Sequence, residues 1–143
     1  MPRSLTPFQV YLRNKIAVVH PGWTESLQEL EDEHGGTELI YQIPSPRNPN
    51  NHLYVSLRED EILVKFAVPG SHVHYDLEET EGLTSGARFD ELWNWAATEY
   101  IRPVLENRLV AVWYGDSEGA LVENVSRFVR MNGIGSYTTE SWS

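Results

Sequence analysis

The sequence of 143 residues contains no cysteine. Without a thiol, the chain cannot form a disulfide, a thiolate nucleophile, a cysteine-bound zinc site or an iron–sulfur centre. The composition permits a reducing compartment. We expect the chain to fold on its apolar core alone, because 41% of its residues are hydrophobic.

Long apolar runs are also missing. No stretch approaches the roughly 20 apolar residues that a membrane-spanning helix needs. The beginning of the chain, MPRSLTPFQVYL, lacks the apolar core of a signal peptide. We therefore expect a cytoplasmic protein that does not associate with membranes.

The motifs of several enzyme classes are absent. The sequence has no G-x-S-x-G elbow, no phosphate-binding P-loop, no G-x-G-x-x-G after a predicted strand and no H-E-x-x-H. Among 21 acidic residues some pair of carboxylates can always be proposed as acid and base, so their abundance carries no weight. The sequence predicts no catalytic residue and no cofactor, and hence a protein that is not an enzyme.

Positive charge is scarce. The chain has 11 Lys and Arg against 21 Asp and Glu, a formal net charge of −10. Such a field repels nucleic acid and attracts cationic partners. Two stretches, 16–46 and 66–87, contain no Lys or Arg. Their acidic residues are Glu25, Glu29, Glu31, Asp32, Glu33 and Glu38 in the first, and Asp76, Glu78, Glu79 and Glu81 in the second. These stretches form either a docking face for a basic protein or a solubilising surface.

What the sequence does contain is the pattern of one domain over residues 1–143. Helical spacing predicts helices over 6–19, 23–34 and 88–105. Alternating apolar residues predict strands over 37–43, 52–58, 61–68, 108–115 and 120–125, and the tail from Ser126 adds one more before ending loosely. The first segment is ambiguous, since 16–19 alone could form a short strand.

Glycine and proline mark two of the expected boundaries. Gly35 and Gly36 are expected to cap the second helix, and Pro103 is expected to kink the third helix or end it near residues 100–102. The order of elements predicts an α+β fold, a mostly antiparallel sheet of about five to six strands with about two to three helices packed on one face.

One cluster resembles a metal site. If residues 72–76 are extended, His72, His74 and Asp76 project from one face, as two imidazoles and a carboxylate would need to do to hold Zn²⁺ or Fe²⁺. The same pattern suits a hydrogen-bonded aromatic pair or part of a partner surface. No further ligand is assured, so we expect no bound metal and keep a metal-dependent enzyme as an alternative.

Aromatic residues supply candidate anchors. Trp93 and Trp113 occupy expected core positions, whereas Trp95 lies on the polar side of its predicted helix. Tyr75 stands beside the acidic run 76–81, and an aromatic ring among carboxylates suits an Arg- or Lys-rich surface. We expect a partner-binding surface, and its residues are His74, Tyr75, Asp76, Glu78, Glu79, Glu81 and Trp95.

Several segments together give the chain a resemblance to a known group of proteins. They are the His-Gly-Gly after the second predicted helix, HLYVSLREDEILVKF, HVHYD, FDELWNWAATEYI and LVAVWYGDSEG. In layout and in the short H-x-H-Y-D motif, residues 23–119 resemble immunity proteins of bacterial polymorphic toxin systems. The resemblance implies a small cytoplasmic antitoxin that binds one cognate toxin domain and covers its active site.

The resemblance and the charge lead to the same expectation. A basic nuclease toxin would be attracted by an acidic inhibitor. The partner is then a cognate toxin protein and not nucleic acid. A structural subunit of a larger assembly is a further alternative, and the sequence leaves the oligomeric state open.

Overall fold

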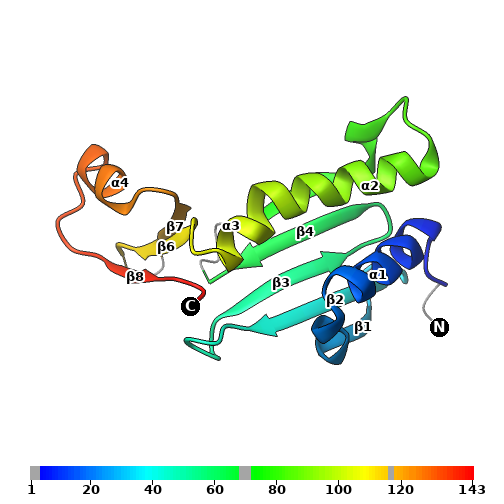
Figure 1. Cartoon of the computed structure of the whole chain (residues 1–143), viewed down its shortest axis with the longest axis horizontal. Coiled ribbons are helices and arrows are strands. Elements are labelled where there is room, and N and C mark those ends of the chain that lie inside the picture. The colour runs from blue at the N-terminus through cyan, green and yellow to red at the C-terminus, as the bar shows by residue number, and fades with distance from the viewer. Residues whose placement is uncertain (1–3, 68–71, 116–117) are drawn as a thin grey trace.

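Two antiparallel sheets and the helices around them make up the fold in the computed structural model (Figure 1). The structure describes residues 4–67, 72–115 and 118–143. The larger sheet has five strands in the order β1-β2-β3-β4-β5, and each is antiparallel to its neighbours. They are β1 (Leu27–Glu31), β2 (Thr37–Pro44), β3 (His52–Leu57), β4 (Glu61–Phe66) and β5 (His72–Asp76). The predicted α+β class is confirmed.

The predicted hairpin of 52–58 and 61–68 corresponds to β3 and β4 and lies inside the sheet, as expected. Its Val68 lies outside the described residues. Alternate side chains of both strands, among them Val55 and Val64, are fully buried. A strand buries one face in this way when one side of its sheet is covered and the other is not.

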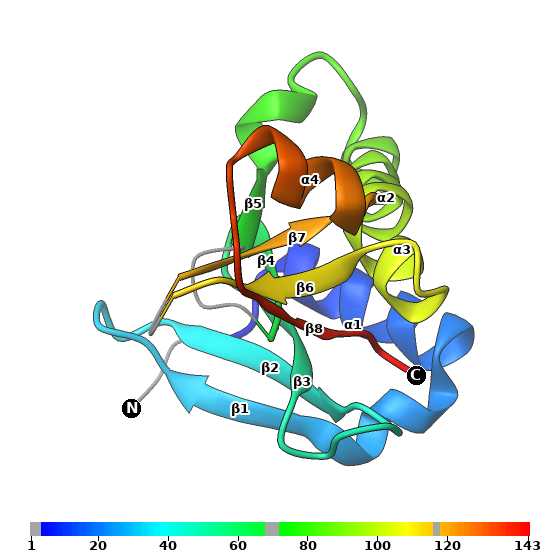
Figure 2. The same ribbon diagram turned by 90° about the vertical axis from the view of Figure 1, so that its left-hand side faces the viewer.

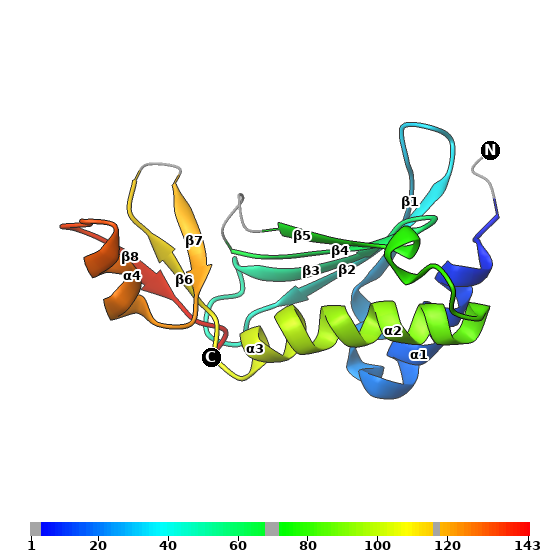
Figure 3. The same cartoon turned by 90° about the horizontal axis from the view of Figure 1, so that it is seen from above.

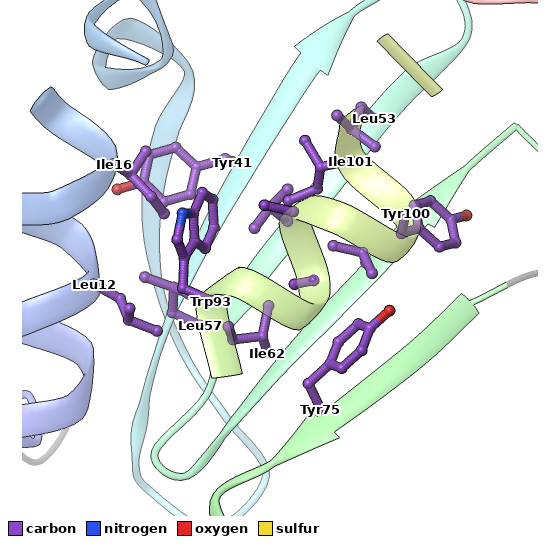
Figure 4. Packing of buried hydrophobic residues seen from close by; sticks show 14 of the residues in the cluster. Leu12, Ile16, Tyr41, Leu53, Leu57, Ile62, Tyr75, Trp93, Tyr100 and Ile101 are labelled. Atoms are coloured by element: carbon purple, nitrogen blue, oxygen red, sulfur yellow. The ribbon is translucent and has the colours of Figure 1, made fainter. Parts of the chain in front are cut away.

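The covered side carries helices α1 (Pro7–Val19) and α2 (Ser85–Ala96), which lie on the same face of the larger sheet (Figure 3). A capping box starts α1. The backbone N–H of Gln9 donates to the Thr6 hydroxyl, and the backbone N–H of Thr6 donates to Gln9 Oε1. Between helices and sheet lies the core, which includes Leu12, Ile16, Tyr41, Leu57, Ile62, Trp93 and Ile101 (Figure 4).

Buried Gln9 also ties α1 to the sheet. Its Nε2 donates to the carbonyl oxygen of Thr37 at 2.6 Å and to that of Leu57 at 3.0 Å. The amide thereby satisfies its hydrogen-bonding groups inside an apolar core. This contact fixes α1 over β2 and β3.

The predicted helix of 88–105 is present but irregular. After α2, a π-helical turn (Ala97–Ile101) leads into α3 (Arg102–Leu105). Pro103 has no N–H to donate, and the wider π turn lies immediately before it. The predicted early end is not found, since the helix continues to Leu105, and a π-helical turn occupies the place where a kink was expected. In the described part of the chain, no helix is long and apolar enough to cross a membrane.

The predicted helix of 23–34 is wrong. A 3₁₀ helix, η1 (Pro21–Ser26), is followed by β1, so only the first residues of this segment are helical. Trp23 is buried, but Leu30 is 47% exposed and His34 is also exposed. Gly35, with φ of +81°, serves the β1–β2 turn and does not cap a helix. The helical spacing of the apolar residues was therefore coincidental.

The C-terminal strands form a second sheet of their own in the order β7-β6-β8 (Figure 2). They are β6 (Val110–Trp113), β7 (Gly119–Val122) and β8 (Thr138–Glu140), with helix α4 (Val125–Met131) between β7 and β8. The hairpin and the additional tail strand are as predicted, although Asp116 and Ser117 of the expected turn lie outside the described residues. The larger sheet has the predicted number of about five to six strands. The second sheet and α4 were not predicted as separate elements.

The end of the chain is held in place, contrary to the expected loose tail. Trp142 is buried and meets Phe66 edge to face with ring centroids 5.8 Å apart. Its carbonyl oxygen accepts from the Ser45 hydroxyl at 2.6 Å. The tail therefore connects the second sheet to the core of the first. Trp93 is buried as predicted, whereas Trp113 is only half-buried.

Candidate functional site

The face of the larger sheet opposite α1 and α2 is the first candidate surface. No helix of the described part lies over it (Figure 3). Tyr75 points into the core, so its neighbours on β5 point the other way. We call this side the open face, and its side chains are Gln28, Leu30, Glu38, Ile40, Gln42, Tyr54, Ser56, Glu61, Leu63, Lys65, His72, His74 and Asp76.

A network of charged groups crosses the open face near one end of the strands. Arg58 donates from Nη1 to Glu61 Oε1 at 2.9 Å and contacts Glu38 Oε1 through Nε at 3.3 Å. The Ser56 hydroxyl donates to the same Glu38 oxygen. His74 Nδ1 lies 3.2 Å from Glu61 Oε2. One guanidinium is thus shared by two carboxylates, and the imidazole of β5 completes the row.

Asp76 extends this row to the edge of the sheet. It lies opposite Glu61 in the β4–β5 ladder. Partial burial, followed by a hydrogen bond and repulsion from Glu61, raises the pKa of the Asp76 carboxyl above its ordinary value, while His74 opposes the shift. Two carboxylates held side by side in this way raise the local negative potential.

This row is part of a larger group of carboxylates at the same end of the sheet. Because the strands are antiparallel, the β1–β2 turn, the β3–β4 turn and the end of β5 meet at one end of the sheet. The backbone N–H of Leu77 donates to the Asp60 carbonyl oxygen at 2.9 Å, which joins the end of β5 to the β3–β4 turn. We call these carboxylates the acidic rim, and its members are Glu31, Asp32, Glu33, Glu38, Glu59, Asp60, Glu61, Asp76, Glu78 and Glu79.

Part of the acidic rim encloses a hollow. A methyl group placed on Gly36 would stand 1.9 Å from Glu59 Oε1 and 2.6 Å from Asp32 Oδ2, so carboxylates of two turns converge there. The hollow has a volume of about 710 Å³, and its lining is Thr6, Glu31, Asp32, Glu33, His34, Glu38, Arg58, Glu59 and Asp60. Six of these nine side chains are carboxylates. This is a site that favours cations and disfavours phosphate.

The two cation-free stretches of the sequence therefore lie at the same end of the larger sheet, separated by the β3–β4 turn. The first stretch supplies the β1–β2 turn, and the second supplies Asp76 together with η2 (Leu77–Thr80). Glu78, Glu79 and Glu81 are exposed on or directly after η2. The β3–β4 turn lies between them and contributes Glu59 and Asp60, which sequence reasoning did not assign to the surface. Their position follows from hairpin parity, since every second turn of a meander lies at the same end.

Tyr75 is a correction among the predicted surface residues. Its ring is only 5% exposed, and its hydroxyl donates to Glu99 Oε2 at 3.2 Å. Burial, followed by the nearby Glu99 carboxylate, raises the pKa of the phenol. The ring belongs to the core beneath α2 (Figure 4). The expectation that Tyr75 stands on the surface as an anchor is wrong.

The other predicted aromatic and imidazole positions are accessible. Trp95 is partly buried and packs against the core. Its predicted position on the polar side of the helix is therefore only half correct. His74 is exposed on the open face. These two side chains keep a free surface, though they lie on opposite sides of the sheet.

A metal centre at residues 72–76 finds no support in the geometry. His72, His74 and Asp76 do share one face, as predicted. The two imidazoles, however, meet edge to face with centroids 5.1 Å apart, and His74 turns its Nδ1 to Glu61. Among the residues that the structure describes, no three His, Asp or Glu side chains are placed to hold a metal ion.

Comparison with known proteins adds nothing to these observations. No protein-family model matches the chain, and no significant match occurs among curated proteins or solved structures.

Proposed function

We propose that the chain is an immunity protein, a stoichiometric inhibitor that binds a cationic toxin domain and covers its active site. The observation that carries the proposal is the acidic rim, which gathers carboxylates from the β1–β2 turn, the β3–β4 turn and the end of β5 at one end of the sheet. A basic nuclease is the class of toxin that such a surface suits, because its own active site attracts polyanions.

The rim contains carboxylates that are available to a partner. Glu31, Glu33, Asp60, Glu78 and Glu79 are exposed, and none forms an ion pair within the described part of the chain. Exposed carboxylates of this kind accelerate association by long-range attraction, and salt screens the effect with a Debye length of about 8 Å at physiological ionic strength. The proposal therefore requires binding that weakens as salt rises.

Short-range contacts would come from the open face beside the rim. His74 and Leu63 offer an imidazole and an aliphatic side chain next to the Arg58 network. Buried anchors of this type slow dissociation, whereas rim charges mainly affect association. Tyr75 has no part in the proposed interface, because its ring is buried.

The test compares two triple variants of the full chain with equal charge. Replacing Asp60, Glu78 and Glu79 by Lys alters the rim, and replacing Glu25, Glu118 and Glu123 by Lys alters exposed positions elsewhere. Each triple changes the formal charge from −10 to −4, since three losses of −1 and three gains of +1 add six.

The partner for this test is the protein encoded directly beside this chain. Titration calorimetry at two salt concentrations should show weaker binding and a smaller salt dependence for the rim variant than for its control. Equal affinities and equal salt dependence for the two variants would remove the rim from the interface and overturn the proposal.

A further inference from the structure

The outer edge of β1 is an unpaired edge of the larger sheet. The backbone N–H of Asp32 donates to the Gly36 carbonyl oxygen at 2.8 Å, in register with the β1–β2 ladder. In an antiparallel ladder alternate residues bond to the neighbouring strand. The even-numbered residues of β1 therefore face β2, and the N–H and C=O groups of Glu29 and Glu31 point outward.

Nothing in the described part of the chain pairs with these outward groups. The strand order ends at β1, and the backbone of Glu29 and Glu31 forms no hydrogen bond outside the sheet. In Figure 2, β1 forms the lower border of the sheet, and no other strand or helix runs along its outer side. An exposed edge of this kind is a template for an added strand.

The side chains of β1 specify what kind of strand fits. Glu29 and Glu31 are exposed on one side of the strand, and Leu30 is 47% exposed on the other side, toward the open face. Cross-strand neighbours are favourable when charges are opposite or when apolar groups meet. The complementary strand therefore carries a cation, an apolar residue and a cation in succession.

This edge is continuous with the acidic rim, since Glu31 both belongs to β1 and lines the hollow. We infer that β1 is the docking edge for an extended basic segment of the partner, in which Lys or Arg alternates with apolar residues and which adds a sixth strand to the sheet. The inference rests on the proposed function for the partner's positive charge.

Other occupants and the other edge fit less well. Antiparallel pairing of two β1 strands about Glu29 would place two glutamates directly opposite each other, and like charges in that position are destabilising. At the opposite edge, β5 exposes the imidazoles of His72 and His74 and carries one carboxylate, Asp76, against the two of β1, so it attracts a cationic strand less. The charge pattern thus selects β1 and a basic partner.

The probe is a capped peptide of about seven residues in which Lys and Val alternate, and its control has the same composition with all Lys before all Val. Amide hydrogen exchange of the full chain is followed by NMR at low salt. The alternating peptide should slow exchange of the Glu29 and Glu31 N–H groups by about tenfold or more, because these donors become bonded. The block peptide should leave them unprotected.

Two variants sharpen the assignment. Glu29→Pro removes an outward N–H without touching the bonds to β2, so proline is tolerated there and peptide protection at Glu31 should be lost. Glu29→Gln keeps the outward N–H and removes one negative charge. The alternating peptide should therefore bind this variant more weakly but still protect the Glu31 N–H from exchange. Equal protection of Glu31 in wild type and Glu29→Pro would overturn the inference.

The outcomes separate this inference from the proposed function. If both peptides bind in a salt-sensitive way and leave Glu29 and Glu31 exchange unchanged, the edge pairing is wrong and the acidic rim remains. If neither peptide binds at low salt, the attraction of cationic partners fails as well. Light scattering that showed a dimer abolished by Glu29→Pro would assign the edge to a second copy and overturn the basic partner.

Discussion

The Tyr100 hydroxyl accepts a hydrogen bond of 2.7 Å from the backbone N–H of Phe66, the last residue of β4. Both residues are buried. The bond joins the π-helical turn to the end of β4, and it gives the buried Phe66 N–H an acceptor. The π-helical part of the long helix therefore has a structural role, because it holds the last residue of β4 in place.

Replacing Tyr100 by Phe should destabilise the protein by about 1–3 kcal/mol, because the buried Phe66 N–H loses its acceptor. The matched control is Tyr75→Phe, which removes a longer and partly exposed hydrogen bond to Glu99 and should cost less. Chemical denaturation at constant pH measures both variants. If Tyr75→Phe lost as much unfolding free energy as Tyr100→Phe, or more, the structural role given to the Tyr100–Phe66 hydrogen bond would be contradicted.

His20 should make stability depend on pH. Its ring stacks on Trp23 with centroids 3.9 Å apart, and burial together with the charge of Arg102 lowers the pKa of the imidazole. A lowered pKa means that the folded state prefers the neutral ring. The stabilisation that the neutral His20 ring contributes is therefore fully present above the unfolded-state pKa of about 6.5. It is lost as pH falls from about 6.5 toward the lower folded-state pKa.

The measurement compares wild type with His20→Phe, which keeps an aromatic ring and cannot be protonated. Urea unfolding between about pH 8 and pH 5 should show a steeper loss of stability in the wild type. Carboxylates titrate in both proteins, so the difference between the curves isolates His20. Parallel curves would show that this imidazole isn't linked to folding.

Asp76 should show the opposite sign. Its pKa is raised by burial and by Glu61, so the folded state prefers the protonated carboxyl. The charged form is unfavourable in the fold, and Asp76→Asn should therefore be more stable than wild type at neutral pH. As pH falls through the raised folded-state pKa to the ordinary value of 3.8, the wild type becomes protonated and the advantage disappears.

Asp60→Asn is the control for this comparison, because it removes a carboxylate that is exposed on the same rim. Thermal unfolding of the three proteins across the acid range gives the difference directly. If the stability advantage of Asp76→Asn over the wild type grew as pH fell, the pH dependence would have the opposite sign to the one expected. That result would refute the coupling of Asp76 to Glu61.

Much of the larger sheet could be predicted from alternation alone. In β3 and β4, Val55 and Val64 bury one face while mostly polar residues face away, and such period-two patterns indicate strands over six residues. The segment of residues 23–34 failed because Trp23 and Leu27 fit both a helix and a strand that follows a 3₁₀ turn. The pattern could not tell that Leu30 lies on an open face.

The site was predicted in part, for a related reason. The two cation-free stretches lie at the same end of the sheet, and Glu59 and Asp60 come to lie between them only through the pairing of the strands. The burial of Tyr75 depends on α2 lying over β5, which no local pattern reports. Contacts between segments distant in the sequence, and not residue type, decided both outcomes.

The shape of the acidic rim should depend on Asp32 as a hydrogen-bond acceptor as well as on its charge. Asp32 Oδ1 accepts from the backbone N–H groups of His34 and Gly36, each at 2.8 Å, and so holds the β1–β2 turn. Asp32→Asn keeps a carbonyl oxygen for these donors, whereas Asp32→Ala removes it.

We expect Asp32→Ala to lower the free energy of unfolding by about 1–2 kcal/mol and to accelerate amide exchange at His34 and Gly36. Asp32→Asn should stay close to wild type in both measurements. Denaturation and hydrogen exchange measure the two effects. Equal losses for both variants would mean that charge alone organises the turn. Faster exchange confined to the alanine variant would show instead that local hydrogen bonds position the carboxylates of the rim before any partner arrives.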